Sequence, residues 1–114
     1  MAKFMFVYRN GHMSAAPSPA EIQKALEKWG AWIEKYSKSG HFVDPGDGLK
    51  PGGRVVRPKG VVSDGPFVES KEVLGGYSIV QAESYEAALA IARECPALED
   101  ADGSLEIREL AGYV

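Results

Sequence analysis

The sequence predicts an α+β fold, because strand-like runs alternate with two segments that have the apolar spacing of amphipathic helices. The helical segments cover residues 19–39 and 85–95. The chain has 114 residues and 45% hydrophobic content, which is enough for one compact core and too little for two. We therefore expect a single domain over residues 1–114.

The first strand is expected in KFMFVY, near the start of the chain. Phe4, Phe6 and Tyr8 alternate with Met5 and Val7, so apolar side chains point to both sides of this strand. An antiparallel sheet with one wet face normally shows alternating polar and apolar residues. We therefore expect this strand to lie centrally, with cover on both of its faces.

A helix start follows at Ser18-Pro19-Ala20-Glu21, where Ser18 can cap the first turn and Glu21 can complete a capping box. The helix is expected to end near Ser39, with Gly40 as a left-handed cap. One apolar stripe of this helix should face the core, and it consists of Ile22, Leu26, Trp29, Ile33 and Tyr36. Trp32 is expected to be partly exposed.

The middle of the chain is rich in glycine and proline. HFV at 41–43 reads as a short strand, and DPGDGLKPGG at 44–53 reads as a loop. RVVR at 54–57 and VVS at 61–63 predict a hairpin. Pro58-Lys59-Gly60 would join its strands through a type I turn and a glycine bulge.

The last third repeats the pattern of strand, helix and strand. LGGYSIVQA is a strand, Ser84 caps the second helix, Pro96 helps to end it, and SLEIREL is a final strand. The whole order matches a ferredoxin-like sandwich with an inserted β-hairpin. Two helices cover only one sheet face, so we expect the open face to pack against another subunit in a homodimer with a barrel-like interior.

Composition excludes several function classes. A net charge of −3 gives no general attraction for nucleic acid. No apolar run is long enough for a secretory signal or a membrane span, and Cys95 is a single cysteine, so we expect a cytoplasmic protein. Two histidines and one cysteine, none at ligand spacing, predict neither a metal site nor a metal cofactor.

The segment Lys50–Gly60 carries four cations and no acid, which leaves −3 minus 4, or −7, for the rest of the chain. Two interpretations are open. The cations can belong to a solvated hairpin. They can also form an electropositive rim that attracts an acidic small molecule.

The stretch DGPF, residues 64–67, is a poor two-residue hairpin, because a residue before proline is pushed toward extended geometry. Asp64 then either forms a local turn in which its side chain hydrogen-bonds to the backbone just ahead of it, or presents a carboxylate at the rim of a cavity. Pro66 would fix the exit direction, and Phe67 would enter a core or pocket.

DGPF, followed by ESKE at 69–72 and GGY at 75–77, resembles the signature of the DGPF group within the YCII-related family. Gly48-Leu49-Lys50-Pro51 and Cys95-Pro96 extend the resemblance over nearly the whole chain. The resemblance implies a dimerising ferredoxin-like domain with a pocket between sheet and helices. It also implies a possible His and Asp pair, although Ala20, Glu21 and Ile22 stand where family members tend to place that histidine.

Two functions of different classes follow. The first is a small-molecule-binding protein for an anionic or aromatic ligand, with cofactor-independent acid–base catalysis assisted by Asp64. His12 could complete a dyad, and the candidate binding residues are Tyr8, Arg54, Phe67, Lys71 and Tyr77, with Arg57 as a further charge partner and His41 as the second histidine. The second function is a ligand-sensing or protein-interaction module, because the resemblance extends to proteins linked to extracytoplasmic-function sigma factors.

Overall fold

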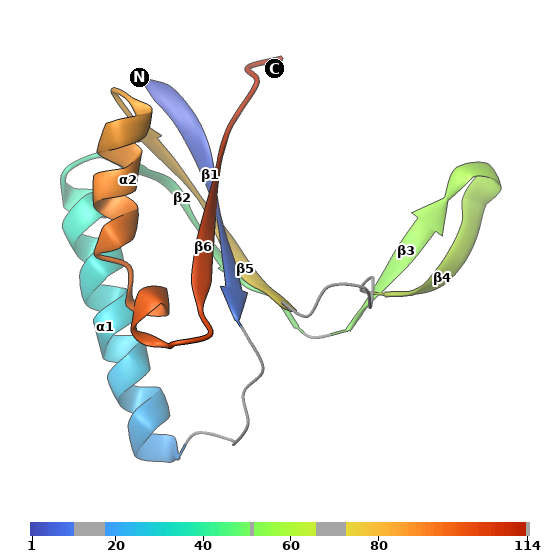
Figure 1. Ribbon diagram of the computed structural model, residues 1–114, viewed down its shortest axis with the longest axis horizontal. Helices are drawn as coiled ribbons and strands as arrows, with labels where there is room; N and C mark the ends of the chain where they lie inside the picture. The colour runs from blue at the N-terminus through green and yellow to red at the C-terminus, as the bar shows by residue number, and fades with distance from the viewer. Residues whose placement is uncertain (11–17, 51, 66–72, 114) are drawn as a thin grey trace.

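The computed structural model describes residues 1–10, 18–50, 52–65 and 73–113. Its main element is a four-stranded antiparallel sheet with the strand order β2-β5-β1-β6 (Figure 1). The strands are β1 (Ala2–Asn10), β2 (Phe42–Gly48), β5 (Val73–Ala82) and β6 (Ser104–Glu109). Strand β1 pairs with β5 on one side and β6 on the other, so it is central, as the sequence predicted.

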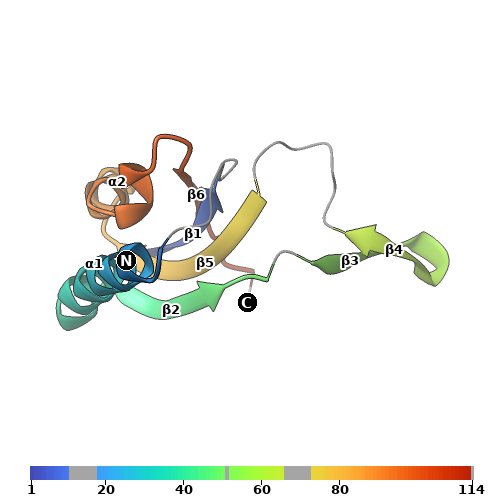
Figure 2. The same cartoon turned by 90° about the horizontal axis from the view of Figure 1, so that it is seen from below.

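Helices α1 (Pro19–Lys38) and α2 (Tyr85–Arg93) lie on the same face of this sheet (Figure 2). Strands β3 (Gly53–Arg57) and β4 (Val61–Gly65) form a separate two-stranded sheet. The α+β class is therefore confirmed, as is the inserted hairpin.

The two helices begin where the capping residues predicted. Ser18 Oγ accepts a hydrogen bond from the Glu21 backbone N–H at 3.2 Å, and Ser84 Oγ accepts one from the Ala87 N–H at 3.1 Å. These bonds satisfy N–H groups that have no partner within the first helical turn. After α1, Gly40 has a φ of +81°, which confirms the expected left-handed cap. Helix α2 ends at Arg93, two residues earlier than expected.

The core lies between the sheet and the helices. Phe4, Phe6 and Val80 are fully buried, and residues of α2 and Pro96–Glu99 close the far side. Trp32 is at the centre of an aromatic cluster, only 5% exposed, and its ring lies 5.1 Å from that of Phe42. The expectation that Trp32 is partly exposed was wrong. Its indole N–H donates to the Ile91 carbonyl at 3.0 Å, so the whole ring can be buried without an unpaired donor.

The expected apolar stripe of α1 faces the core only in the C-terminal half of the helix, because every residue from 18 to 28 is exposed. Ile22 is 45% exposed and Leu26 is 62% exposed, whereas Trp29, Ile33 and Tyr36 pack against the core as half-buried residues. The N-terminal half of α1 therefore presents apolar side chains to solvent.

Strand β2 is longer than expected, since DPGDG continues the strand instead of forming a loop. The register of β2 against β5 shifts between Phe42 and Asp44 and again between Asp44 and Asp47. The second shift contains Pro45 and Gly46, which are left out of the regular pairing. Because β2 is an edge strand, Pro45 can be accommodated without removing a hydrogen bond from a central ladder. Gly46 has a φ of +71°, the left-handed conformation that favours glycine.

The turn between β3 and β4 also differs from the expected type. Lys59 has a φ of +68° and a ψ of 14°, and Gly60 follows with a φ of +77°. The positive φ of Lys59 contradicts the type I turn that the sequence predicted, because both central residues of a type I turn have negative φ.

The sheet face away from the helices has an apolar centre. By strand alternation Met5 and Val7 point to this face, together with Tyr77 and Ile79 on β5. Val7 is only 8% exposed although it does not belong to the helix-side core. The other three are half-buried. We call this surface the open face.

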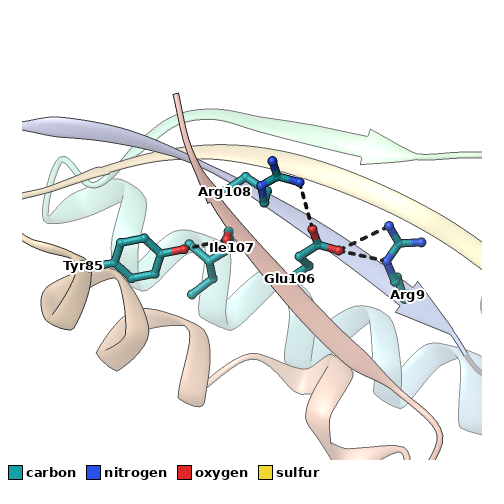
Figure 3. Close-up of polar contacts among 5 residues, drawn as sticks. All are labelled: Arg9, Tyr85, Glu106, Ile107 and Arg108. Atoms are coloured by element: carbon teal, nitrogen blue, oxygen red, sulfur yellow. Dashed lines mark hydrogen bonds and ion pairs between the residues drawn. The ribbon is translucent and has the colours of Figure 1, made fainter. Parts of the chain in front are cut away.

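A charged cluster borders the open face (Figure 3). Glu106 on β6 accepts from Arg9 Nε at 3.3 Å, and its second carboxylate oxygen lies 3.4 Å from Arg108 Nη1. Nearby, the Tyr85 hydroxyl donates to the Ile107 carbonyl at 2.7 Å, which ties the first turn of α2 to β6. The partly exposed ion pairs add little stability, but they fix the position of the Glu106 carboxylate.

Candidate functional site

A cavity of about 390 Å³ lies between α1 and the ends of β2 and β5. This volume is in the range of small-molecule sites, roughly 300–1,000 Å³. Its described lining combines three apolar residues of α1 with a residue of β1 and short segments of β2 and β5. These residues are Tyr8, Leu26, Trp29, Ile33, Pro45, Gly46, Asp47, Gly48, Gly75, Gly76, Tyr77 and Ser78.

The polar part of the cavity wall is a short hydrogen-bond chain. The Tyr8 hydroxyl donates to Ser78 Oγ at 2.7 Å, and the Ser78 hydroxyl donates to the Pro45 carbonyl at 2.6 Å. Burial raises the pKa of Tyr8 above its usual range, and the hydrogen bond to Ser78 opposes that shift only in part. Tyr8 therefore stays protonated near neutral pH, and its oxygen can accept a hydrogen bond from a bound molecule.

The apolar wall comes from α1. The Trp29 ring stands edge-on to the Tyr8 ring, with their centroids 4.9 Å apart. Leu26 and Ile33, two helical turns apart on α1, both line the cavity, and Leu26 is 62% exposed. A pair of aromatic rings beside exposed aliphatic groups is suited to contacts with a flat apolar molecule.

Glycines bring β2 and β5 into unusually close contact at the other wall. A Cβ on Gly46 would lie 1.8 Å from the Tyr77 carbonyl oxygen, and one on Gly76 would lie 2.8 Å from the Asp47 carbonyl oxygen. A glycine within a strand often marks a place where another backbone or a ligand comes close. At Gly76 the close neighbour is the backbone of β2.

Asp47 is the only acidic residue among the described residues that line the cavity, and none of those lining residues is a lysine or an arginine. Its side chain is exposed, and Oδ1 accepts from the Gly48 backbone N–H at 2.7 Å. The second carboxylate oxygen remains available to solvent or to a donor on a ligand. The cavity therefore has no cationic group in its described lining with which to hold an anion.

The structure brings together two of the residues that the sequence singled out. Tyr8 and Tyr77 both line the cavity, although they contribute different atoms. Tyr77 is paired with Val7, so its Cβ lies on the open face and its main chain borders the cavity.

The other candidates lie elsewhere or outside the described residues. Asp64 and Arg54 are exposed and opposite each other on β4 and β3, and neither lines the cavity. His12, Phe67 and Lys71 fall outside the described residues, so their roles stay predictions, as does the catalytic role of Asp64.

His41 and Cys95 lie outside the described lining of the cavity, and each interacts with residues near it in the sequence. His41 Nδ1 lies 2.6 Å from Ser39 Oγ, just before β2. Burial raises the pKa of Cys95 to about 12, and a hydrogen bond with the Ala97 backbone offsets this only partly. Cys95 is 2% exposed, so its thiol is buried and stays protonated near neutral pH.

Sequence reasoning missed Ser78, Pro45 and Asp47 as cavity residues. Ser78 is the one buried polar residue within the described core, and it alternates with apolar neighbours on a central stretch of β5. A serine at such a position needs a hydrogen-bond partner, and this signal could have drawn attention to it. Pro45 and Asp47 gave no such signal, because the segment was read as a loop.

No helix in the described part of the chain is long and apolar enough to cross a membrane.

The chain is similar to an uncharacterized protein, R00369, of Rhizobium meliloti (strain 1021), with 31% identity over 111 residues. The alignment covers 93% of this chain and 89% of the relative. The YCII-related domain matches residues 2–112. The chain therefore belongs to the YCII-related family.

Proposed function

We propose that this protein binds a small, uncharged aromatic molecule in the cavity between α1 and the β2–β5 edge. The observation that carries this proposal is the composition of the cavity wall. Trp29 and Tyr8 offer two ring surfaces, Leu26 and Ile33 extend the apolar wall, and the Tyr8–Ser78 chain supplies a single polar anchor. Apolar pockets with a few placed polar groups are the usual form of small-molecule sites.

The charge of the cavity favours a neutral ligand over the anionic one that the sequence also suggested. Asp47 repels an anion, and none of the described lining residues is a lysine or arginine that could bind one. The cations of 50–60 would have to act from outside the cavity, and Arg54 and Lys59 are exposed on the hairpin.

A matched pair of fluorescent probes tests this proposal. N-phenyl-1-naphthylamine is uncharged, and 8-anilinonaphthalene-1-sulfonate carries the same two ring systems with an added sulfonate. We expect the neutral probe to bind at least about tenfold more tightly, because the sulfonate would be desolvated beside Asp47. Equal or tighter binding of the sulfonate would contradict the neutral ligand and favour the anionic one.

Two variants of α1 locate the binding site. Leu26→Asp places a carboxylate on the cavity wall, whereas Ile22→Asp makes the same change one turn earlier, at an exposed residue that does not line the cavity. The dissociation constant for N-phenyl-1-naphthylamine should rise about tenfold or more in Leu26→Asp and less than about twofold in Ile22→Asp. Equal effects in the two variants would place the probe elsewhere.

We further propose that the domain is ferredoxin-like and forms a two-fold dimer through the open face. The strand order β2-β5-β1-β6 with both helices on one face supports the topology. The apolar centre of Met5, Val7, Tyr77 and Ile79 on an uncovered sheet face supports the dimer.

Sedimentation equilibrium tests the dimer. Met5→Lys should shift the protein toward monomer, because a lysine would be buried at the centre of the interface. Leu98→Lys is the matched control, since Leu98 is 45% exposed on the helix side of the molecule. A wild-type protein that stays monomeric at every concentration would rule out the dimer.

The proposal of a cavity ligand can be extended to acid–base catalysis by Asp64. This extension requires the Asp64 carboxylate to reach the bound molecule. Asp64→Asn removes the charge and keeps the shape. If this variant lowers probe affinity while the fold is retained, Asp64 takes part in the site. If it does not, ligand sensing without catalysis is the better description of the cavity, in line with the alternative of a sensing module.

A further inference from the structure

The β3–β4 hairpin, which we call the arm, consists of residues Gly53–Gly65. It extends away from the four-stranded sheet and its helices (Figures 1 and 2). Val56, Val61 and Val62 on the arm are 69%, 57% and 52% exposed. An isolated two-stranded hairpin is at best marginally stable in water. An arm with this much exposed valine would therefore gain stability from a partner surface.

One face of the arm carries both apolar and charged groups. Val56 pairs with Val62, and Arg54 pairs with Asp64 two residues further from the turn. Since residues directly opposite in an antiparallel ladder share a face, these four side chains form one surface. Within the described part of the chain, the side chains of Arg54 and Asp64 form no ion pair or hydrogen bond, so both charges are available for a partner.

We propose that this face of the arm packs against the same face of a second copy of the chain. A two-fold axis would place Arg54 of each copy beside Asp64 of the other and would bring the two valine pairs into contact. The surface is self-complementary about an axis that runs along the arm between its two strands, because Arg54 on β3 lies directly opposite Asp64 on β4, and Val56 lies opposite Val62 in the same way. This contact would be a second interface of the dimer proposed above, and it therefore rests on that proposal. It does not depend on whether the cavity binds a ligand.

The same surface fits other partners less well. A nucleic acid would be attracted by Arg54 but repelled by Asp64 on the same face, and the whole chain has a net charge of −3. An anionic membrane surface meets the same objection. A second copy satisfies both charges at once.

Charge reversal with mixing tests the proposal. Arg54→Glu leaves two negative charges on the face, and Asp64→Arg leaves two positive charges. Each variant alone should self-associate at least about tenfold more weakly than the wild type in sedimentation equilibrium, because two like-charge contacts form across the axis. An equimolar mixture should form heterodimers in preference to either homodimer. The double variant Arg54→Glu/Asp64→Arg should recover wild-type association.

Lys59→Glu is the matched control, since it changes the charge of the arm as Arg54→Glu does, but at the turn. It should leave association within about twofold of the wild type. If Arg54→Glu and Lys59→Glu behave alike, or if mixing gives no preference for heterodimers, the arm contact is overturned.

The outcomes separate this proposal from the others. If Met5→Lys dissociates the dimer while the arm variants do not, the dimer stands and the arm contact fails. If the wild type is monomeric at every concentration, both the dimer and the arm contact are ruled out. The proposal of a cavity ligand is not affected by that result, because it is tested separately by binding of N-phenyl-1-naphthylamine. If Arg54→Glu and Lys59→Glu weaken binding to a duplex DNA probe equally without changing self-association, the arm serves a nucleic acid instead.

Discussion

Replacement of Trp32 by alanine is expected to lower the free energy of unfolding by about 3 to 5 kcal/mol, the usual cost of removing a large aromatic residue from a core. Trp32 is 5% exposed and packs against rings from β1, α1 and β2. Its removal also takes away the hydrogen bond to the Ile91 carbonyl that links α1 to α2. Since a domain of this size has a total stability of about 5 to 15 kcal/mol, the variant would lose a large fraction of its free energy of unfolding. Urea denaturation followed by circular dichroism measures the change.

Trp29→Ala is the control for Trp32→Ala. Trp29 lies three residues earlier on α1, is half-buried and faces the cavity, so its removal creates less new void in the core. We expect a smaller loss of stability, about 1 to 2 kcal/mol, together with loss of N-phenyl-1-naphthylamine binding. A larger stability loss for Trp29→Ala than for Trp32→Ala would contradict the assigned positions of the two indoles.

Gly46→Ala is the second substitution with a large expected effect. An alanine Cβ would lie 1.8 Å from the Tyr77 carbonyl oxygen and 3.1 Å from Ser78 Cα, both backbone atoms that cannot rotate away. The residue also has a φ of +71°, which costs a non-glycine residue about 1 to 2 kcal/mol by itself. Strand β2 must therefore move away from β5, and we expect a total loss above about 2 kcal/mol.

Gly40→Ala separates the collision from the backbone strain. Gly40 has a φ of +81°, and nothing lies within 4 Å of a Cβ built there. This variant should lose only the free energy of the backbone strain, about 1 to 2 kcal/mol, in urea denaturation. Gly46→Ala should also weaken N-phenyl-1-naphthylamine binding, because the cavity wall shifts with β2. Equal stability losses in the two variants would show that the β2–β5 contact is looser than described.

Much of the fold followed from local signals. The alternation in β1, the serine caps of α1 and α2, and the Pro58–Gly60 turn each act over a few residues, and each gave an element close to its observed bounds. Strand β2 was underestimated because Pro45 and Gly46 usually interrupt strands. Their tolerance depends on β2 being an edge strand, and that position is set by contacts with β5 far along the chain.

The core side of α1 shows the limit of periodicity. A stripe through Ile22, Leu26 and Trp29 and a stripe through Trp32 are neighbours on one helix, and the spacing alone does not choose between them. Burial on α1 begins only at Trp29, and Trp32 is buried against the Ile91 carbonyl, 59 residues away, which accepts its indole N–H. The exposed Leu26 and the half-buried Trp29 are left to form the cavity wall.

The candidate site was harder to predict than the fold. Tyr8 was identified from the sequence, but its hydrogen-bond partner Ser78 lies 70 residues away, and the next acceptor, Pro45, lies 33 residues before Ser78. No spacing pattern connects three such residues. The DGPF motif drew attention to Asp64, which the structure places on the arm, while the described lining of the cavity does not include Asp64 or Gly65.

The most direct test of the proposed cavity ligand is a heteronuclear NMR titration that follows the two tryptophan indole N–H signals. Trp29→Phe assigns them, because one signal disappears. On addition of N-phenyl-1-naphthylamine, we expect the Trp29 signal to shift, since Trp29 lines the cavity. The Trp32 signal should shift much less, because its N–H is held by the Ile91 carbonyl. A shift of Trp32 alone would place the probe in the groove between the two helices, and no shift of either signal would contradict the proposed site.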